Sequence, residues 1–163
     1  MLILLALITS LLLLSACKDV GFYEGMDGPS PVPYKKADWR SFGKKADFEM
    51  RVDVNSIQHE AQYSDSNYAF VWMQQRFNDE QIDGVSKGKY QLKYTRSAIH
   101  CESTRMAQIA VALHDLDDNE VARYDVPGFQ WEFAEPAKDS YGSDFVRQVC
   151  QLMAEKDKAA QEE

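Results

Sequence analysis

The sequence predicts an α+β fold, in which an antiparallel β-meander of about six strands is closed by one C-terminal α-helix. Strict alternation is the first sign: positions 48, 50, 52 and 54 are apolar, and positions 49, 51 and 53 are charged. Short apolar runs then recur between turn-forming segments. The last sign is an apolar stripe at Phe145, Val149, Leu152 and Met153, whose i, i+4, i+7, i+8 spacing is helical.

A short apolar stretch opens the chain and ends just before Cys17. As a helix, residues 1–16 would reach roughly 24 Å, whereas a hydrocarbon core is about 30 Å thick. The length is therefore typical of a secretory signal peptide. An uncleaved anchor, and an ordinary signal peptide with an unrelated cysteine after it, are the alternatives.

Leu14-Ser15-Ala16-Cys17 resembles a bacterial lipobox. The resemblance implies that residues 1–16 are removed and that Cys17 is acylated, so that the mature lipoprotein is held at the membrane through its lipid. The next residue, Lys18, is not the acidic residue of an inner-membrane retention signal. We therefore expect a lipid-anchored protein of the cell envelope, at the outer membrane.

Composition limits the remaining chain to one domain and excludes one class of partner. Residues 17–163 are a typical single-domain length, and the formal net charge of −8 argues against nucleic acid. Once Cys17 carries lipid, Cys101 and Cys150 remain as an even pair in an oxidising compartment. A disulfide between them would pin the C-terminal helix to the strand that carries Cys101.

Residues 17–36 are expected to be a tether, because Pro29, Pro31 and Pro33 alternate and favour extended chain. The folded domain follows at 37–153, and 154–163 is a charged, helical tail. In chain order, strands are expected around 39–42, 48–54, 68–77, 90–101, 105–114 and 121–124, with a last short strand at 130–133. The polar stretch 78–88 is expected to be a loop.

The type of one element and the ends of two others follow from local sequence signals. A helix is possible at 105–114 on composition alone, but we favour a strand because 116–120 is a good turn and Val121–Tyr124 follows as a partner. The second strand is expected to end at Asp53–Ser56, where Asp and Asn favour turns. For the C-terminal helix, Ser143 is the expected N-cap.

Several pieces in this order resemble the surface-adhesin protein E family of bacterial lipoproteins. They are Trp39, Asp53-x-x-Ser56-Ile57, Val71-Trp72, His100-Cys101 to Arg105, Tyr124-Asp125, Gly128, Trp131, Pro136, Ser140 and Val149-Cys150. The resemblance covers about 37–153. It implies an antiparallel sheet with a C-terminal helix, a disulfide, a possible homodimer and, for some members, binding of host extracellular-matrix proteins. It offers no catalytic residues, and the proline-glycine-serine segment before the helix is here spread over 136–140 and beyond.

No catalytic, metal or cofactor site is expected. Cys101 beside His100 would need a free thiolate to act as a nucleophile, and Cys150 is a ready partner for its sulfur. His59, His100 and His114 lack metal-ligand spacing.

The segment from Asp115 resembles a calcium loop at first sight. It has Glu120 where that loop needs glycine and Val126 where it needs a bidentate glutamate. A hairpin turn is the better interpretation.

The leading functional hypothesis is a non-enzymatic, lipid-anchored protein that binds another protein, with a host ligand as one case. The binding surface would be exposed strand faces and the segments 55–66 and 78–88. A periplasm-facing structural or accessory lipoprotein is the alternative, and an envelope enzyme comes third. Tyrosines and arginines near the loops could be binding hot spots or ordinary core-packing side chains; they are Tyr63, Tyr68, Tyr90, Tyr94, Arg76 and Arg96.

Overall fold

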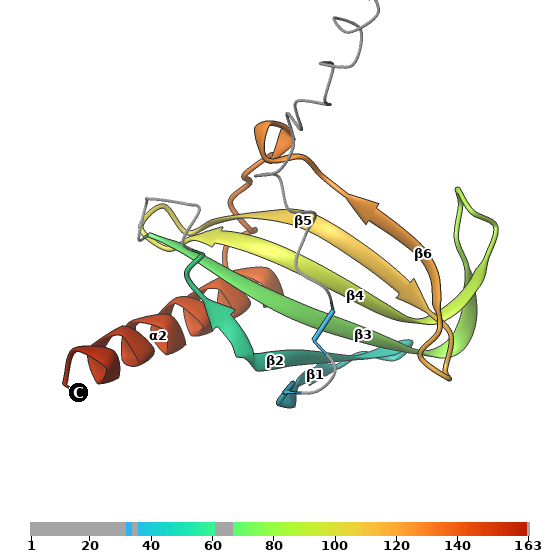
Figure 1. The fold of residues 1–163 in the computed structure, drawn as a ribbon, viewed down its shortest axis with the longest axis horizontal. Helices are drawn as coiled ribbons and strands as arrows, with labels where there is room; N and C mark the ends of the chain where they lie inside the picture. The colour runs from blue at the N-terminus through green and yellow to red at the C-terminus, as the bar shows by residue number, and fades with distance from the viewer. Residues whose placement is uncertain (1–31, 34–35, 61–66, 163) are drawn as a thin grey trace, which may run out of the picture. The chain divides into compact units, whose positions relative to one another are not determined.

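The structure, a computed structural model, describes residues 32–33, 36–60 and 67–162. Its centre is a six-stranded antiparallel sheet in which each strand pairs with its neighbours in sequence (Figure 1). The strands are β1 (Trp39–Lys44), β2 (Phe48–Gln58), β3 (Tyr68–Ile82), β4 (Lys89–His100), β5 (Arg105–His114) and β6 (Glu120–Asp125). A 3₁₀ turn, η1 (Gly128–Gln130), and one long helix, α2 (Tyr141–Gln161), complete the fold. The predicted α+β meander is confirmed.

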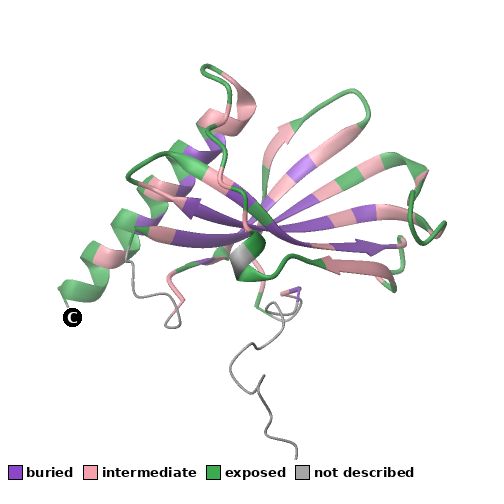
Figure 2. Cartoon of the chain, turned by 90° about the horizontal axis from the view of Figure 1, so that it is seen from above, coloured by how far each residue is buried: buried purple, intermediate pink, exposed green. Residues whose placement is uncertain are grey.

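Helix α2 covers one face of the sheet, over β2 and β3. The alternation along β2 places Met50 and Val52 on that face, where they pack against Phe145 and Val149 of the helix. Figure 2 shows buried residues along the middle of the long strands and exposed residues at the hairpin ends. The cluster between α2 and the sheet is the principal core, because burial of apolar area is the main stabilising contribution in a domain of this size.

The opposite face of the sheet carries two further apolar clusters. One gathers around Trp72 and Tyr94 and includes Val32, so the last part of the predicted tether segment packs on the domain. The other gathers around Phe70, with Trp131 and Phe133 from the connection before α2 packed against it. The first half of strand β3 is therefore buried on both faces, as its run of apolar residues predicts.

Strand β2 does not end at Asp53–Ser56, and that prediction is wrong. The strand continues to Gln58 through a register shift, and side chains stabilise the irregularity. Asp53 Oδ1 accepts from the backbone N–H groups of Asp38 (2.7 Å) and Asn55 (3.1 Å). The Ser56 hydroxyl donates to the Asp53 carbonyl and accepts from the Trp72 N–H at 2.8 Å. The Asp-x-x-Ser pattern thus stabilises an irregularity in the β2–β3 pairing, at which residues 54–57 of β2 lie opposite a single residue of β3 and the strand nevertheless continues.

Replacing Asp53 by alanine should lower the free energy of unfolding by about 2 kcal/mol. The reason is that two backbone N–H groups would lose a charged, buried acceptor. Urea denaturation of the variant measures the effect, with Asp47→Ala as the matched surface control, for which we expect a change within about 0.5 kcal/mol. Equal effects of the two substitutions would contradict the role assigned to Asp53.

Other boundaries also differ from the predictions. Strand β3 runs on to Ile82, so only 83–88 is a turn; residues 78–80 are polar because that part of the hairpin is exposed on both faces. The predicted strand at 130–133 is wrong: η1 ends at Gln130, residues 131–133 have no regular secondary structure, and a single bridge follows between Ala134 and Met106. Strands at 90–101, 105–114 and 121–124 are confirmed.

The helix begins one turn earlier than Ser143 predicts. Ser140 is the N-cap: its hydroxyl accepts from the Ser143 N–H, and the Ser143 hydroxyl accepts from the Ser140 N–H in return. Ser143 is therefore the third residue of a reciprocal capping box. The helix extends through Gln161, so that most of the predicted charged tail is its last turns.

Candidate functional site

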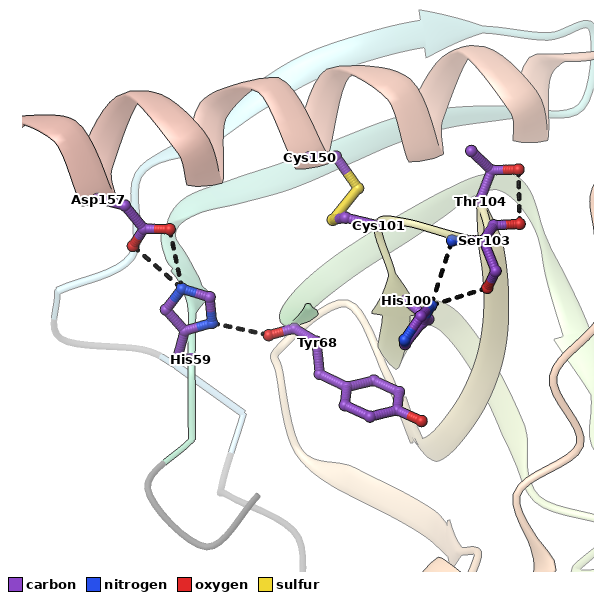
Figure 3. The surroundings of a disulfide bond; sticks show 8 residues. All are labelled: His59, Tyr68, His100, Cys101, Ser103, Thr104, Cys150 and Asp157. Atoms are coloured by element: carbon purple, nitrogen blue, oxygen red, sulfur yellow. Dashed lines mark hydrogen bonds and ion pairs between the residues drawn. A yellow bond between two sulfur atoms is a disulfide. The ribbon is translucent and has the colours of Figure 1, made fainter. Parts of the chain in front are cut away.

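The two cysteines of the domain are joined. Cys101, directly after β4, and Cys150 on α2 form a disulfide with Cα atoms 5.5 Å apart, separated by 49 residues in the chain. Figure 3 shows the bond running from the β4–β5 turn to the underside of the helix. Because this pairing uses the Cys101 thiol, a Cys101–His100 nucleophile is excluded. Cys17 lies outside the described residues.

A histidine fastens the C-terminal half of the same helix. His59 Nε2 lies 3.0 Å from both carboxylate oxygens of Asp157, and His59 Nδ1 lies 2.9 Å from the Tyr68 carbonyl oxygen (Figure 3). Only the imidazolium can donate from both nitrogens at once. The hydrogen bond to Asp157 accordingly raises the pKa of His59 above its ordinary value.

Stability should therefore fall as pH rises through the folded-state pKa of His59. A group whose pKa is raised by folding stabilises fully below its unfolded value, about 6.5, and loses that contribution above the raised value. Urea denaturation at pH 6 and pH 8.5 tests this on the wild type and Asp157→Asn. We expect the stability difference between the two proteins to be larger at pH 6. A difference that grows toward pH 8.5 would contradict the assignment.

The three histidines do not gather. His59 faces α2, whereas His100 is the half-buried last residue of β4, where the Ser103 hydroxyl is 2.8 Å from its Nδ1. His114 is buried at the end of β5, with Nδ1 3.0 Å from the carbonyl oxygen of Asp118. Within the described parts of the chain, no cluster of three or more His, Cys, Asp or Glu residues could hold a metal ion.

The segment from Asp115 to Glu120 forms the β5–β6 turn, as predicted. Asp115 accepts from both the backbone N–H and the side-chain amide of Asn119, each at 2.9 Å. Asp118 lies in the left-handed region at φ 66°, which aspartate tolerates in turns. The Asp115 carboxylate therefore stabilises the turn.

A chain of polar side chains crosses the sheet on the face opposite α2. Arg51 donates to Gln74 Oε1 at 3.2 Å, and Gln74 donates to the Tyr94 hydroxyl at 2.9 Å. That hydroxyl donates to Asp118 Oδ1 at 2.9 Å, and His114 Nδ1 lies 3.0 Å from the same oxygen. Buried hydrogen-bonded networks of this kind fix one packing of a core. The arrangement explains why strongly polar residues lie on a buried face.

The tyrosine and arginine set divides between core and surface. Tyr94 and Arg96 are buried, so the hot-spot interpretation is wrong for them. Arg96 pairs with Glu60 and lies over the Phe70 ring, and burial lowers its pKa to about 10. Arg76 is exposed on β3. Tyr63 lies outside the described residues.

The β3–β4 hairpin forms the most exposed apolar tip. Ile82, the last residue of β3, is 66% exposed, and Val85 in the following turn is 78% exposed. Figure 1 shows this hairpin projecting past its neighbours. The Tyr124 hydroxyl of β6 donates to Asp83, which lowers the pKa of that carboxyl to about 2. The Tyr124–Asp83 contact holds the base of the hairpin, so the two exposed apolar side chains of the tip are presented to solvent at a defined place where a partner could reach them.

A separate groove lies between α2 and the strands β1 and β2. It has a volume of about 550 Å³ and is partly open to solvent. Its apolar lining comes from Phe42, Val52, Val54, Phe145, Val149 and Leu152. The sequence predicted the helical stripe that supplies three of these side chains, but not that its outer part would remain uncovered.

Comparisons with known proteins agree with this architecture. The profile of a family described as surface-adhesin protein E matches residues 39–151, from the first residue of β1 to one residue beyond Cys150. No curated protein matches the sequence. Among the described residues, no helix is long and apolar enough to cross a membrane.

Solved structures with this fold include protein E of Haemophilus influenzae. In its crystal form II the TM-score is 0.52 at 10% identity, and the match covers 78% of this chain and 98% of that chain. Protein E from non-typeable Haemophilus influenzae gives a TM-score of 0.51 at 10% identity, covering 77% of this chain and 83% of that chain. At this identity the likeness shows a shared fold.

Proposed function

Because this chain belongs to the surface-adhesin protein E family, we propose that it is a non-enzymatic protein of the cell envelope that binds another protein. The observation that carries the proposal is the family match together with the exposed apolar tip of the β3–β4 hairpin. An adhesin needs an accessible contact surface rather than a reaction centre. The described side chains agree, since the polar residues considered as candidates are engaged in turns, caps and packing.

The proposed organisation places this domain at the end of a lipid anchor. Residues 1–16 are the signal peptide, Cys17 carries the lipid, and residues 17–36 lead to the domain at 37–153, with 154–163 after it. Multiple acyl chains on Cys17 would hold the protein stably, since a single chain binds membranes only marginally. The resemblance to a lipobox supports the lipid anchor, and Lys18 in place of an acidic residue supports placement at the outer membrane.

Lipidation is tested by Cys17→Ala. The variant should leave the membrane fraction or accumulate as an unprocessed precursor, because the acyl acceptor is gone. Mass spectrometry of the purified wild type should show an acylated residue 17 at the amino terminus. A variant that stays with membranes at full mature length would refute the lipid anchor.

Protein binding is tested on the hairpin. Intact cells that display the wild type are incubated with immobilised extracellular-matrix proteins, and retention is compared with Ile82→Ser/Val85→Ser and with Leu116→Ser. Leu116 is a matched control because it is also exposed, at 52%, but lies on the β5–β6 turn. We expect the double variant to lose about tenfold in apparent affinity and Leu116→Ser to bind as the wild type does. Equal retention of all three would reject the hairpin as the binding surface.

Accessibility separates the adhesin from a periplasm-facing accessory lipoprotein. Protease applied to intact cells should cleave the protein if it faces outward. If it is protected until the outer membrane is permeabilised, the accessory function replaces the adhesin one.

The family resemblance also suggests a homodimer. Its test is the oligomeric state of the purified protein by light scattering.

A further inference from the structure

The groove between α2 and β1–β2 is not explained by protein binding at the hairpin. We propose that this groove binds a free fatty acid, with the acyl chain along α2 and the carboxylate at Lys156. The proposal goes beyond the proposed function and does not depend on it. It rests on the shape, lining and charge of the groove.

The groove has the size and lining of a small-ligand site. Its volume of about 550 Å³ lies inside the range of roughly 300–1,000 Å³ in which proteins hold small molecules. Between Phe145 and Lys156, the position proposed for the head group, the helix rises about 17 Å, which accommodates a medium-length extended fatty acid. The floor is apolar, with Phe145, Val149 and Leu152 of the helix along it, and Gln148 and Glu155 are the polar helix residues at its margin besides Lys156. Leu152 remains 37% exposed. A linear apolar chain matches this form.

One end of the groove carries a positioned cation. The Lys156 ammonium donates to the carbonyl oxygens of Val54 (2.9 Å) and Ile57 (2.8 Å), and all three residues line the groove. An ammonium group has three N–H donors, so two carbonyls leave one donor and the full positive charge for a ligand. A carboxylate is the group that matches both. Because the carbonyl oxygens hold the ammonium in place, little side-chain entropy remains to be lost on binding.

The other charged groups at the groove are compatible with an anionic head group. Arg40 adds a second positive charge, of which two N–H donors are bound to Asp38 at 2.7 and 3.0 Å. Glu155 is the carboxylate among the lining residues, and it accepts from Gln151 on the helix surface at 3.0 Å. Because Asp38 offsets the charge of Arg40, Lys156 is the cation on which the proposal depends.

A peptide strand is a poorer occupant. Strand β1 is the terminal strand beside the groove, and a peptide could in principle extend the sheet there. However, β1 has six residues, carries Arg40 and Lys44, and shifts register between Ser41 and Gly43. Short length, charge and a bulge are the features that protect edge strands from pairing with another chain. A ligand that fills the groove without pairing to the strand fits better.

The test uses residues 17–163 with Cys17→Ser, so that no attached acyl group competes. Laurate is titrated below its micelle-forming concentration and followed by calorimetry, with dodecyltrimethylammonium as the cationic probe of equal chain length. We expect laurate to bind one to one and the cationic probe to bind at least about tenfold more weakly. This comparison uses a single protein, so it does not depend on the folding of any variant.

A pair of variants places the binding in the groove. Leu152→Gln should raise the laurate Kd by about tenfold, and Leu116→Gln, an exposed leucine outside the groove, should leave it unchanged. Circular dichroism and thermal unfolding confirm that both are folded. Absence of saturable laurate binding, or equal effects of the two substitutions, would overturn the site.

Two further outcomes address the ligand. Equal affinity for the cationic probe would overturn the assignment of a carboxylate to Lys156. If the lipidated protein fails to bind laurate while the Cys17→Ser chain binds it, the protein's own acyl chain occupies the groove, and a free fatty acid is overturned as the ligand. Binding of laurate by both forms supports the proposal as stated.

Discussion

Phe145→Ala should lower the free energy of unfolding by about 4 kcal/mol. Phe145 is buried in the core cluster between α2 and the sheet, and its ring meets that of Phe42 edge-on with centroids 5.5 Å apart. Truncation removes the buried apolar area and leaves a cavity that a long helix and a hydrogen-bonded sheet cannot close. Urea denaturation of the purified domain, monitored by circular dichroism, gives the value.

Leu152→Ala is the matched control, on the same helix but 37% exposed. We expect a loss below about 1.5 kcal/mol there, because less area leaves water when the helix docks. Since small domains are stable by only about 5–15 kcal/mol, the Phe145 variant should also unfold at a clearly lower temperature. Similar losses at both positions would show that α2 contributes little through its buried face.

Removing the disulfide should cost a similar amount. Cys101→Ala/Cys150→Ala opens a loop of 49 residues, and chain-entropy arithmetic puts the loss at about 4 kcal/mol. The bond joins the end of β4 to the middle of α2, so it also limits local separation of the helix from the sheet. Denaturation of the double variant, compared with the oxidised wild type, measures the sum of these effects.

The reduced wild type is the control for packing at the two sites. It keeps both sulfur atoms but lacks the bond, so it should lose nearly as much stability as the double variant. If the reduced protein were as stable as the oxidised one, the bond would not constrain the unfolded chain. Because the two large predictions concern neighbouring parts of α2, combining Phe145→Ala with reduction need not be additive.

The disulfide supports the groove along α2 but not the β3–β4 hairpin. It anchors α2 near its middle, and the His59–Asp157 contact anchors the C-terminal half. The groove lies along the same helix, from Phe145 to Ala159. Anything that loosens α2 should therefore weaken fatty-acid binding while leaving the β3–β4 hairpin unaffected. This difference allows the two proposed sites to be examined independently.

Sequence reasoning succeeded wherever one periodicity dominated. Alternation at 48–54 predicted the face of β2 that meets the helix, and the stripe from Phe145 to Met153 predicted the face of α2 that meets β2. Both patterns are local consequences of burying one side of an element. The pairing of Cys101 with Cys150 was also predictable, because composition left two cysteines for an oxidising compartment.

It failed where a polar residue's partner comes from another part of the chain. Asp53 was interpreted as a strand end, yet its acceptor oxygen serves the N–H of Asp38, fifteen positions away. For Tyr94 and Arg96 the sequence leaves a binding hot spot and core packing open, and the sheet decides for packing because it places both on a second buried face. A polar residue in a strand gives the same sequence signal whether it faces solvent or makes a buried hydrogen bond.

By itself, the sequence determined the class of fold, the order of its elements and the cysteine pair, since each follows from local periodicity, turn chemistry or composition. Tertiary structure alone decided what remains exposed. The β3–β4 tip remains exposed at the end of its hairpin. On α2, Leu152 remains partly exposed in the groove beside β1, an edge strand of only six residues. Exposure depends on which elements meet across the chain, and no single segment contains that information.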